Sequence, residues 1–285
     1  MSIKLHGVSA GYSGFMLRDI SLTITKGSFT ALIGPNGCGK STLLNTIARV
    51  LPTRAGTIHI GGRNIATART KEIARTVTVL PQNPVVPPAI SVEQLVHYGR
   101  APHQNLLGMR SQADHDAVEN ALHTTSLTDL RRRPLAELSG GQRQRAFIAM
   151  CLAQDTPYLL FDEPTSFLDI RYQYETLDLL ADLQSTGRTC VVVLHDIAQA
   201  ARYADNLVVM RDGAIQAQGR PADVVTPEML SQIYDLQAKV FSDPVSCTPA
   251  LSPVSAGRLS NLNEHIQTSQ SLENPDAREV AVRFH

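Results

Sequence analysis

A glycine-rich segment near the N-terminus limits the architecture more than any other part of the chain. Gly34–Ser41 (GPNGCGKS) fits the pattern G-x-x-x-x-G-K-[ST]. It follows a short apolar segment, residues 29–33, and precedes apolar residues at helical spacing in residues 41–50. A loop between a strand and a helix turns backbone N–H groups inward around a phosphate, and the helix N-terminus adds a fixed positive field. The segment therefore predicts a nucleotide-phosphate site in which Lys40 reaches the β and γ phosphates and Ser41 holds magnesium.

Two later apolar runs end in titratable residues. Residues 158–161 (YLLF) are followed by Asp162 and Glu163, and residues 190–194 (CVVVL) are followed by His195. Such runs are typical of buried parallel strands, whose C-terminal ends bind ligands in open α/β sheets. We expect Asp162 to bind magnesium, Glu163 to orient and polarise the attacking water, and His195 to contact the γ-phosphate. Taken singly, the acidic pair could be a solvated turn and His195 a core histidine, but the phosphate loop in the same chain favours the functional interpretation.

A second candidate anion site begins another predicted helix. Ser139-Gly140-Gly141 precedes an amphipathic helix over residues 143–152. Ser139 could simply cap that helix, with the two glycines as a turn. One nucleotide does not need two phosphate cradles, so the second cradle requires another explanation.

The flanking patterns predict an α/β fold. Polar and apolar residues alternate near the N-terminus, as in half-buried antiparallel strands. Four prolines in residues 81–88 mark a hinge. After the hinge, Ser91 is expected to cap a helix through Tyr98, and residues 113–126 form a second helix. We therefore expect a mixed-sheet core with N-terminal antiparallel strands and an inserted helical subdomain over about residues 85–150.

The last segment changes in character. Residues 241–285 are rich in serine and proline and are predicted to be a flexible C-terminal extension. Val280, Val282 and Phe284 alternate in a way that could form one edge strand, although a frayed terminus is the favoured interpretation.

Composition excludes several classes of protein. The 285 residues are 43% hydrophobic, and 26 basic side chains balance 26 acidic ones. Zero net charge argues against a nucleic-acid or membrane-surface binder held by bulk charge. No apolar run approaches the roughly 18 residues that cross a bilayer, and residues 1–10 lack the apolar core of a signal peptide. Four separated cysteines without a CxxC pair indicate neither a disulfide framework nor a zinc site. These features predict a cytoplasmic protein.

Together the motifs resemble those of the ABC transporter ATPases, over residues 1 to about 240. The resemblance implies a P-loop NTPase with a RecA-like core that hydrolyses ATP with Mg²⁺. It identifies residues 34–41 as the Walker A loop and LSGGQ at residues 138–142 as the signature. Residues 166–169 match the D-loop, although Phe167 stands where alanine is more usual.

The resemblance also implies a role for each matching residue. Catalysis would involve Glu163, His195, Lys40 and the Q-loop glutamine Gln82, and magnesium would contact Ser41, Gln82 and Asp162. Tyr12 matches the aromatic residue that stacks on adenine. The other ATP-binding positions would be Gly34, Pro35, Asn36, Gly37, Cys38, Gly39, Lys40, Ser41 and Thr42. The ATP of a partner subunit would contact Ser139, Gly140, Gly141 and Gln142, with Asp169 in the D-loop beside them.

This last assignment explains the second cradle. In the family, two copies dimerise head to tail, and each signature closes on the γ-phosphate held by its partner's Walker A loop. ATP binding favours the closed dimer, and hydrolysis followed by phosphate loss removes the contacts that differ between the states. Because the chain lacks a membrane span, two separate permease subunits would form the channel, docked on residues 83–137. The resemblance places the protein peripherally at the cytoplasmic face of a bacterial inner membrane.

Residues in and after the helix expected beyond the proline hinge indicate one group within the ABC transporter ATPases. The segments Val92–Arg100, with Pro102 and His103 after it, and Gln142–Met150 are similar to ATPases of bacterial ferric siderophore, haem and vitamin B12 importers, which a substrate-binding protein supplies. A ferric siderophore is the favoured cargo, and haem, vitamin B12 and zinc or manganese are the alternatives. Two non-transport classes of ABC ATPase are disfavoured. Those of DNA repair would carry a long coiled coil between Walker A and the signature, and those of translation would carry two tandem ATPase domains; the sequence shows neither pattern.

Cys38 carries a separate hypothesis. A thiol near a helix N-terminus tends to have a lowered pKa, which would make Cys38 reactive toward alkylators and protected by ATP. Alternatively, Cys38 only fills a position that requires a small residue.

Overall fold

A computed structural model describes residues 2–87, 89–104 and 110–254. A six-stranded sheet forms its core, in the order β10-β9-β3-β8-β7-β6. The strands from β9 to β6 run parallel, and β10 is antiparallel to β9. The central strands β3, β7 and β8 are buried along their whole length because both faces of the sheet are covered. The strand bounds are β3 Phe29–Ile33, β6 Val77–Leu80, β7 Tyr158–Asp162, β8 Thr189–Val193, β9 Asn206–Arg211 and β10 Ala214–Gly219.

The predicted N-terminal antiparallel strands belong to a second sheet. Its order is β2-β1-β4-β5, and every pairing in it is antiparallel. One face is apolar and buried while the other carries polar residues, which is the pattern that a half-covered antiparallel sheet allows. The bounds are β1 Ile3–Tyr12, β2 Phe15–Ile24, β4 Ala55–Ile60 and β5 Arg63–Asn64.

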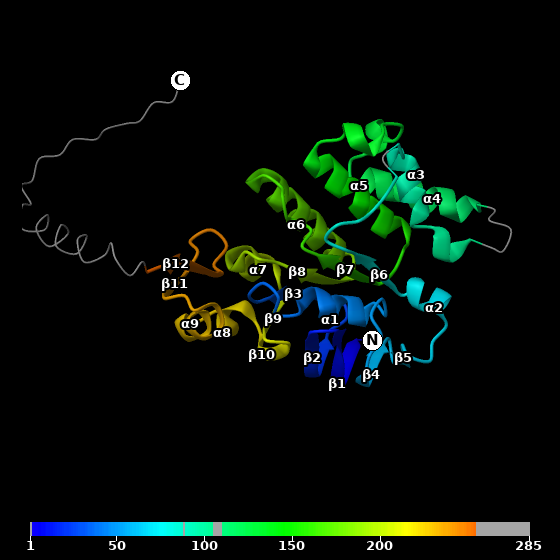
Figure 1. The fold of residues 1–285 in the computed structure, drawn as a ribbon. Helices are drawn as coiled ribbons and strands as arrows, with labels where there is room; N and C mark the ends of the chain where they lie inside the picture. The colour runs from blue at the N-terminus through cyan, green and yellow to red at the C-terminus, as the bar shows by residue number, and fades with distance from the viewer. Residues whose placement is uncertain (1, 88, 105–109, 255–285) are drawn as a thin grey trace, which may run out of the picture.

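The central strand β3 faces two hydrophobic cores. Phe29, Ala31 and Ile33 belong to one core, and Leu32 belongs to the other, because successive side chains of a strand point to opposite faces. The core around Leu32 joins the two sheets through α1, which lies between them (Figure 1). This layering holds the end of β3, and the loop that follows it, between two packed faces.

The helices cover the remaining faces of the central sheet. α3, α4 and α5 gather at one end of the molecule, away from the C-terminal hairpin (Figure 1). The expected cap of α3 is confirmed, since Ser91 Oγ accepts a hydrogen bond from the backbone N–H of Gln94. The helix bounds are α1 Lys40–Ile47, α2 Thr70–Ala74, α3 Val92–Tyr98, α4 Gln112–Thr124, α5 Gly140–Ala153, α6 Ile170–Ser185, α7 Ile197–Tyr203, α8 Pro221–Val224 and α9 Pro227–Tyr234, with 3₁₀ turns at Ala101–His103, Thr128–Leu130 and Leu135–Glu137.

A buried ion pair ties the three clustered helices together. Arg100, just after α3, pairs with Asp114 of α4 at 2.8 Å, and both side chains are less than a tenth exposed. Arg100 also donates to the carbonyl oxygen of Ala153 at the end of α5, at 2.7 Å. Burial raises the pKa of the Asp114 carboxyl, but hydrogen bonds from Ser111 and the contact with Arg100 together hold it far below its usual range. Arg100 is therefore a structural residue of the helical cluster.

Replacing Arg100 with methionine is expected to destabilise the protein by about 3–5 kcal/mol, because it leaves the Asp114 carboxylate buried without its cation. Urea unfolding measures the change. Arg171→Met provides the matched control, since it removes an exposed ion pair with Glu175 and should not change the unfolding midpoint measurably. Equal midpoints for the two variants would contradict the structural role of Arg100.

The structure differs from the expected flexible extension in residues 241–254. Strands β11 (Ala238–Ser242) and β12 (Pro249–Pro253) form an antiparallel hairpin that packs against α7 and α9. Leu251 and Val240 are packed against the main core, and Asp243 accepts hydrogen bonds from the backbone of Val245 and Ser246 in the turn. The prolines of this segment are compatible with the hairpin because proline is tolerated in edge strands. The possible strand at Val280, Val282 and Phe284 lies outside the described residues.

Candidate active site

The glycine-rich loop joins β3 to α1, as predicted. Gly34 and Gly39 have φ values of 148° and 106°, a region in which any residue with a side chain would be strained. A Cβ atom at Gly34 would lie 2.1 Å from the carbonyl oxygen of Met210. Lys40 is buried within the loop, where its Nζ donates to the carbonyl oxygens of Gly34 at 2.8 Å and Pro35 at 3.0 Å. The loop therefore encloses a positive charge and a series of backbone groups.

A hollow of about 430 Å³ opens over this loop. Tyr12, the residue expected to stack on adenine, lines this hollow. Phe15 lines the hollow too and is the direct cross-strand partner of Tyr12 in the β1–β2 hairpin. Sequence reasoning missed Phe15, although an aromatic residue three positions after Tyr12 across a glycine turn was the signal available. The remaining lining residues are Asn36, Gly37, Gly39, Lys40, Ser41, Thr42 and Glu163.

Ser41 and Asp162 meet beside the hollow. The Ser41 hydroxyl donates to Asp162 Oδ1 at 2.9 Å, although 121 residues separate them. Asp162 is buried at the end of β7, and this burial raises the pKa of its carboxyl, while the Ser41 hydrogen bond and the charge of Lys40 lower it. The result is a buried carboxylate and a hydroxyl, both oxygen donors, next to the phosphate loop.

Two of the expected residues, Gln82 and His195, converge on the Glu163 carboxylate. The Gln82 amide donates to one oxygen, and His195 Nε2 lies 2.5 Å from the other. Ser166 Oγ also donates to Glu163, at 3.0 Å. The convergence follows from the sheet: β6, β7 and β8 are parallel neighbours, so their C-terminal ends deliver Gln82, Glu163 and His195 to one edge. Glu163 itself has a φ of 51°, a left-handed conformation that is strained for this residue.

The signature segment lies apart from this hollow. Ser139 caps α5, with its Oγ accepting from Gln142 N–H while Gln142 Oε1 accepts from Ser139 N–H. Gly141 packs against Tyr172 of α6, where a Cβ atom would lie 2.7 Å from the ring. Asp169 directly precedes α6 at the N-cap position. The described lining of the hollow includes neither Asp169 nor Ser139, Gly140, Gly141 and Gln142.

The expected lowering of the Cys38 pKa is wrong. Burial of the Cys38 thiol raises its pKa, and this effect exceeds the opposing influence of Lys40, whose Nζ lies 3.8 Å from the sulfur. The Cys38 sulfur lies close to Gly34, where a Cβ atom would be 2.8 Å from it. Proximity to a helix N-terminus does not lower a thiol pKa when the thiol is desolvated.

Iodoacetamide at pH 8 is therefore expected to modify the exposed Cys247 well before Cys38. A raised pKa means that Cys38 forms less thiolate at this pH, and its burial also restricts access. Mass spectrometry of tryptic peptides measures both rates. Labelling of Cys38 at the rate of Cys247 would contradict this order, and Cys151, which is buried away from the loop, gives the unreactive reference.

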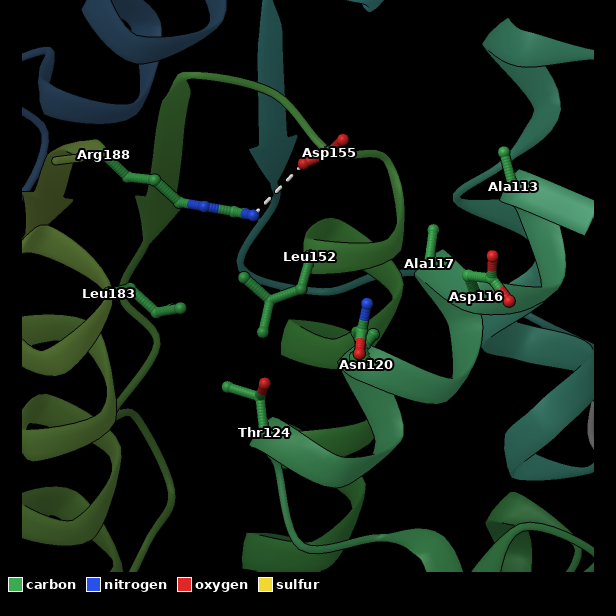
Figure 2. Close-up of a pocket in the computed structure, with 10 residues that line it drawn as sticks. Ala113, Asp116, Ala117, Asn120, Thr124, Leu152, Asp155, Leu183 and Arg188 are labelled. Atoms are coloured by element: carbon green, nitrogen blue, oxygen red, sulfur yellow. Dashed lines mark hydrogen bonds and ion pairs between the residues drawn. The ribbon is translucent and has the colours of Figure 1, made fainter. Parts of the chain in front are cut away.

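A separate cavity of about 290 Å³ lies between α4 and the end of α6 (Figure 2). Asp116, Asn120 and Thr124 line it from α4, and Arg188 extends over it from the opposite side to pair with Asp155 at 3.2 Å. Its described lining shares no residue with the hollow at the phosphate loop. The cavity therefore lies where the clustered helices α4 and α5 meet α6.

Within the ranges that the structure describes, no helix has the length and apolar character of a membrane span.

Comparison with known proteins agrees with this geometry. The ABC transporter family profile matches residues 17–166. The petrobactin import ATP-binding protein FpuD of Bacillus anthracis is 46% identical over 244 residues, which cover 85% of this chain and 89% of that protein. The ferric enterobactin transport ATP-binding protein FepC of Escherichia coli (strain K12) is 44% identical over 249 residues, covering 87% and 92%. The dimeric structure of MJ0796, a bacterial ABC transporter cassette, has a TM-score of 0.67 at 27% identity, covering 76% of this chain and 98% of that one. The chain therefore belongs to the ABC transporter family and is an ATP-binding, ATP-hydrolysing subunit.

Proposed function

We propose that this chain hydrolyses ATP to drive import of a ferric siderophore through separate membrane permease subunits. The observation that carries the ATPase part is the convergence of Gln82, His195 and Ser166 on the Glu163 carboxylate beside the phosphate loop. The cargo rests on similarity over most of the chain to two proteins whose names specify petrobactin import and ferric enterobactin transport.

In this proposal the loop binds the phosphates and Glu163 accepts the proton of the attacking water. Lys40, held inside the loop, would exchange its contacts with Gly34 and Pro35 for phosphate oxygens. Tyr12 and Phe15 offer aromatic faces to the adenine ring. Gln82 and His195 orient the Glu163 carboxylate, so the proton transfers along a fixed direction.

The donor set fits magnesium. Mg²⁺ prefers oxygen ligands and usually takes one or two from the protein, with phosphates and water completing its shell. Ser41 Oγ and the buried Asp162 carboxylate provide such oxygens, and Gln82 lies at the adjacent strand end. Ser41 and Asp162 would hold the ion, with Gln82 near it. When bound, the ion supplies positive charge that neutralises the phosphate oxygens as the bond to the γ-phosphorus breaks.

We further propose that two copies act as a head-to-tail dimer. Ser139, Gly140, Gly141 and Gln142 and the D-loop residue Asp169 lie away from the chain's own hollow, which leaves them available to a partner's ATP. Phe167 and Ile170, beside Asp169, are exposed apolar residues that an interface would cover. The dimeric bacterial ABC transporter cassette of similar fold supports this arrangement.

Residues 83–137 of each copy, which make up most of the helical subdomain, are the proposed docking site for the two permease subunits. This subdomain follows Gln82 in the chain, and Gln82 contacts the Glu163 carboxylate. The same segment would therefore lie between the nucleotide site and the permease. Val85 and Tyr98 are exposed apolar residues there. With a substrate-binding protein delivering the cargo, the assembly would sit at the cytoplasmic face of the bacterial inner membrane.

Uptake of radiolabelled ferric enterobactin and ferric petrobactin tests the cargo. The chain is co-expressed with siderophore-importer permeases in cells that lack their own siderophore ATPase, as wild type and as Glu163→Gln. Uptake that only the wild type supports is the expected result. ATP hydrolysis by the purified chain without uptake through any siderophore permease would refute the siderophore cargo, and the same assay would then be run with haem, vitamin B12 and metal ions.

A further inference from the structure

A series of side-chain hydrogen bonds connects α7, the helix that follows His195, to the D-loop at residues 166–169. Gln199 of α7 is only 4% exposed, and its Nε2 donates to Gln173 Oε1 of α6 at 2.7 Å. Gln173 Nε2 in turn donates to the carbonyl oxygen of Leu168 at 2.9 Å. The acceptor fixes the direction of the series: a carbonyl oxygen requires the Gln173 amino group, so the Gln173 oxygen must face the amino group of Gln199.

The same glutamine is tied to the histidine loop through its backbone. Asp196 directly follows His195 and caps α7, with its Oδ1 accepting from Gln199 N–H at 2.9 Å. Gln199 therefore contacts the segment that carries His195 with its backbone, and reaches α6 with its side chain. Buried amides that are fully hydrogen-bonded hold their neighbours in one arrangement.

At the Leu168 end of this series, the D-loop turn has a strained backbone that requires contacts from outside the turn. Phe167 has a φ of 63°, a left-handed conformation that is strained for a bulky residue, and its side chain is 93% exposed. Packing of the Phe167 ring therefore cannot maintain the turn. The backbone hydrogen bonds within the turn run from Ser166 N–H to the Glu163 carbonyl at 3.1 Å and from Leu168 N–H to the Thr165 carbonyl at 3.4 Å. The Gln173 contact is shorter and comes from a rigid helix.

The turn leads back to the reacting carboxylate. Ser166, next to Phe167, donates its hydroxyl to Glu163, and His195 contacts the same carboxylate. The contacts thus close a ring that passes from His195 through Gln199, Gln173, the D-loop turn and Glu163. We infer that Gln173 and Gln199 are positioning residues for ATP hydrolysis. They hold the turn containing Ser166 and Phe167, and this keeps the Glu163 carboxylate and the His195 ring in fixed positions relative to each other. The inference rests on the catalytic role proposed for Glu163.

Leucine substitutions separate positioning from stability. In the full-length chain, Gln173→Leu and Gln199→Leu are expected to lower kcat about 10- to 100-fold, the range expected for misplacement of a catalytic group by up to about 1 Å. The KM for ATP should stay within about twofold, because neither residue lines the hollow. The double variant removes both facing amides, so its thermal unfolding midpoint should return toward the wild-type value while kcat stays low.

A readout besides activity follows the turn itself. Hydrogen–deuterium exchange of the backbone amides in residues 165–170 is expected to speed up in all three variants. Gln184→Leu is the matched control: Gln184 lies on the same helix α6 and donates its amide to the carbonyl oxygen of Gly27 at 2.6 Å, away from the site. It should leave kcat and the exchange of residues 165–170 unchanged.

Two results would overturn the inference. One is a kcat within about twofold of wild type in the single variants; the other is a kcat that recovers with the unfolding midpoint in the double variant, which would make the pair merely structural. Failure of the proposed function gives a different pattern, because Glu163→Gln would then keep its turnover whatever the glutamine variants do.

Discussion

Glu163→Gln is expected to lower the rate of ATP hydrolysis about 10²- to 10⁴-fold while ATP still binds. The substitution keeps the shape of the side chain and removes the group that takes the proton of water. Glutamine can still accept from Ser166 or Gln82 through its oxygen, so the turn at the end of β7 should persist. Steady-state phosphate release measures the rate, and binding of a fluorescent ATP analogue measures affinity.

The same variant should accumulate as a dimer with ATP. If ATP holds two copies together and hydrolysis separates them, the blocked enzyme elutes as a dimer in size-exclusion chromatography when ATP is present and as a monomer when it is absent. Glu175→Gln, at a surface position on α6, is the control and should keep the wild-type rate. Turnover of Glu163→Gln within a few-fold of the wild-type rate would remove Glu163 from its role as the base.

Local patterns were sufficient to predict the elements that carry the site. The apolar runs that end at Asp162 and before His195 are neighbouring parallel strands, and the C-terminal ends of such strands share one edge of a sheet. Ser91 caps α3 as expected, and Ser139 caps α5, which was one of the two interpretations open for it. An N-cap can be predicted because it depends on the next three residues of the chain. What these predictions share is that each depends on contacts within a short segment or on a general rule of sheet topology.

Features that depend on contacts between distant segments could not be predicted in this way. Gln173 and Gln199 lie on different helices, and no spacing rule brings two such amides to 2.7 Å. Arg100 was noted only as part of a family-like segment, whereas its pairing with Asp114 is set by how α3 and α4 pack. For Cys38 the sequence indicates a helix start but not how deeply the thiol is buried, and burial decides the direction of its pKa shift.

Lys40→Met should have the other large effect, on both binding and turnover. Methionine keeps much of the buried stem but removes the charge that the loop encloses, and a hydrogen bond to a charged group is worth about 1.5–3 kcal/mol. Since about 1.4 kcal/mol is a factor of ten, the affinity for ATP should fall roughly 10- to 150-fold. The loss should be greater in kcat/KM, because a preorganised donor contributes a further factor of about 10²–10³ as charge develops in the transition state.

Comparison of Lys40→Met with Glu163→Gln distinguishes the two roles. Lys40→Met should bind the fluorescent ATP analogue weakly and remain monomeric with ATP, whereas Glu163→Gln should bind it and dimerise. Lys26→Met removes an exposed lysine before β3 and should match the wild type in both assays, which controls for the change in net charge. If Lys40→Met bound ATP as tightly as the wild type, Lys40 would act only within the loop, through its bonds to the Gly34 and Pro35 carbonyls, and the phosphates would be held by the backbone alone.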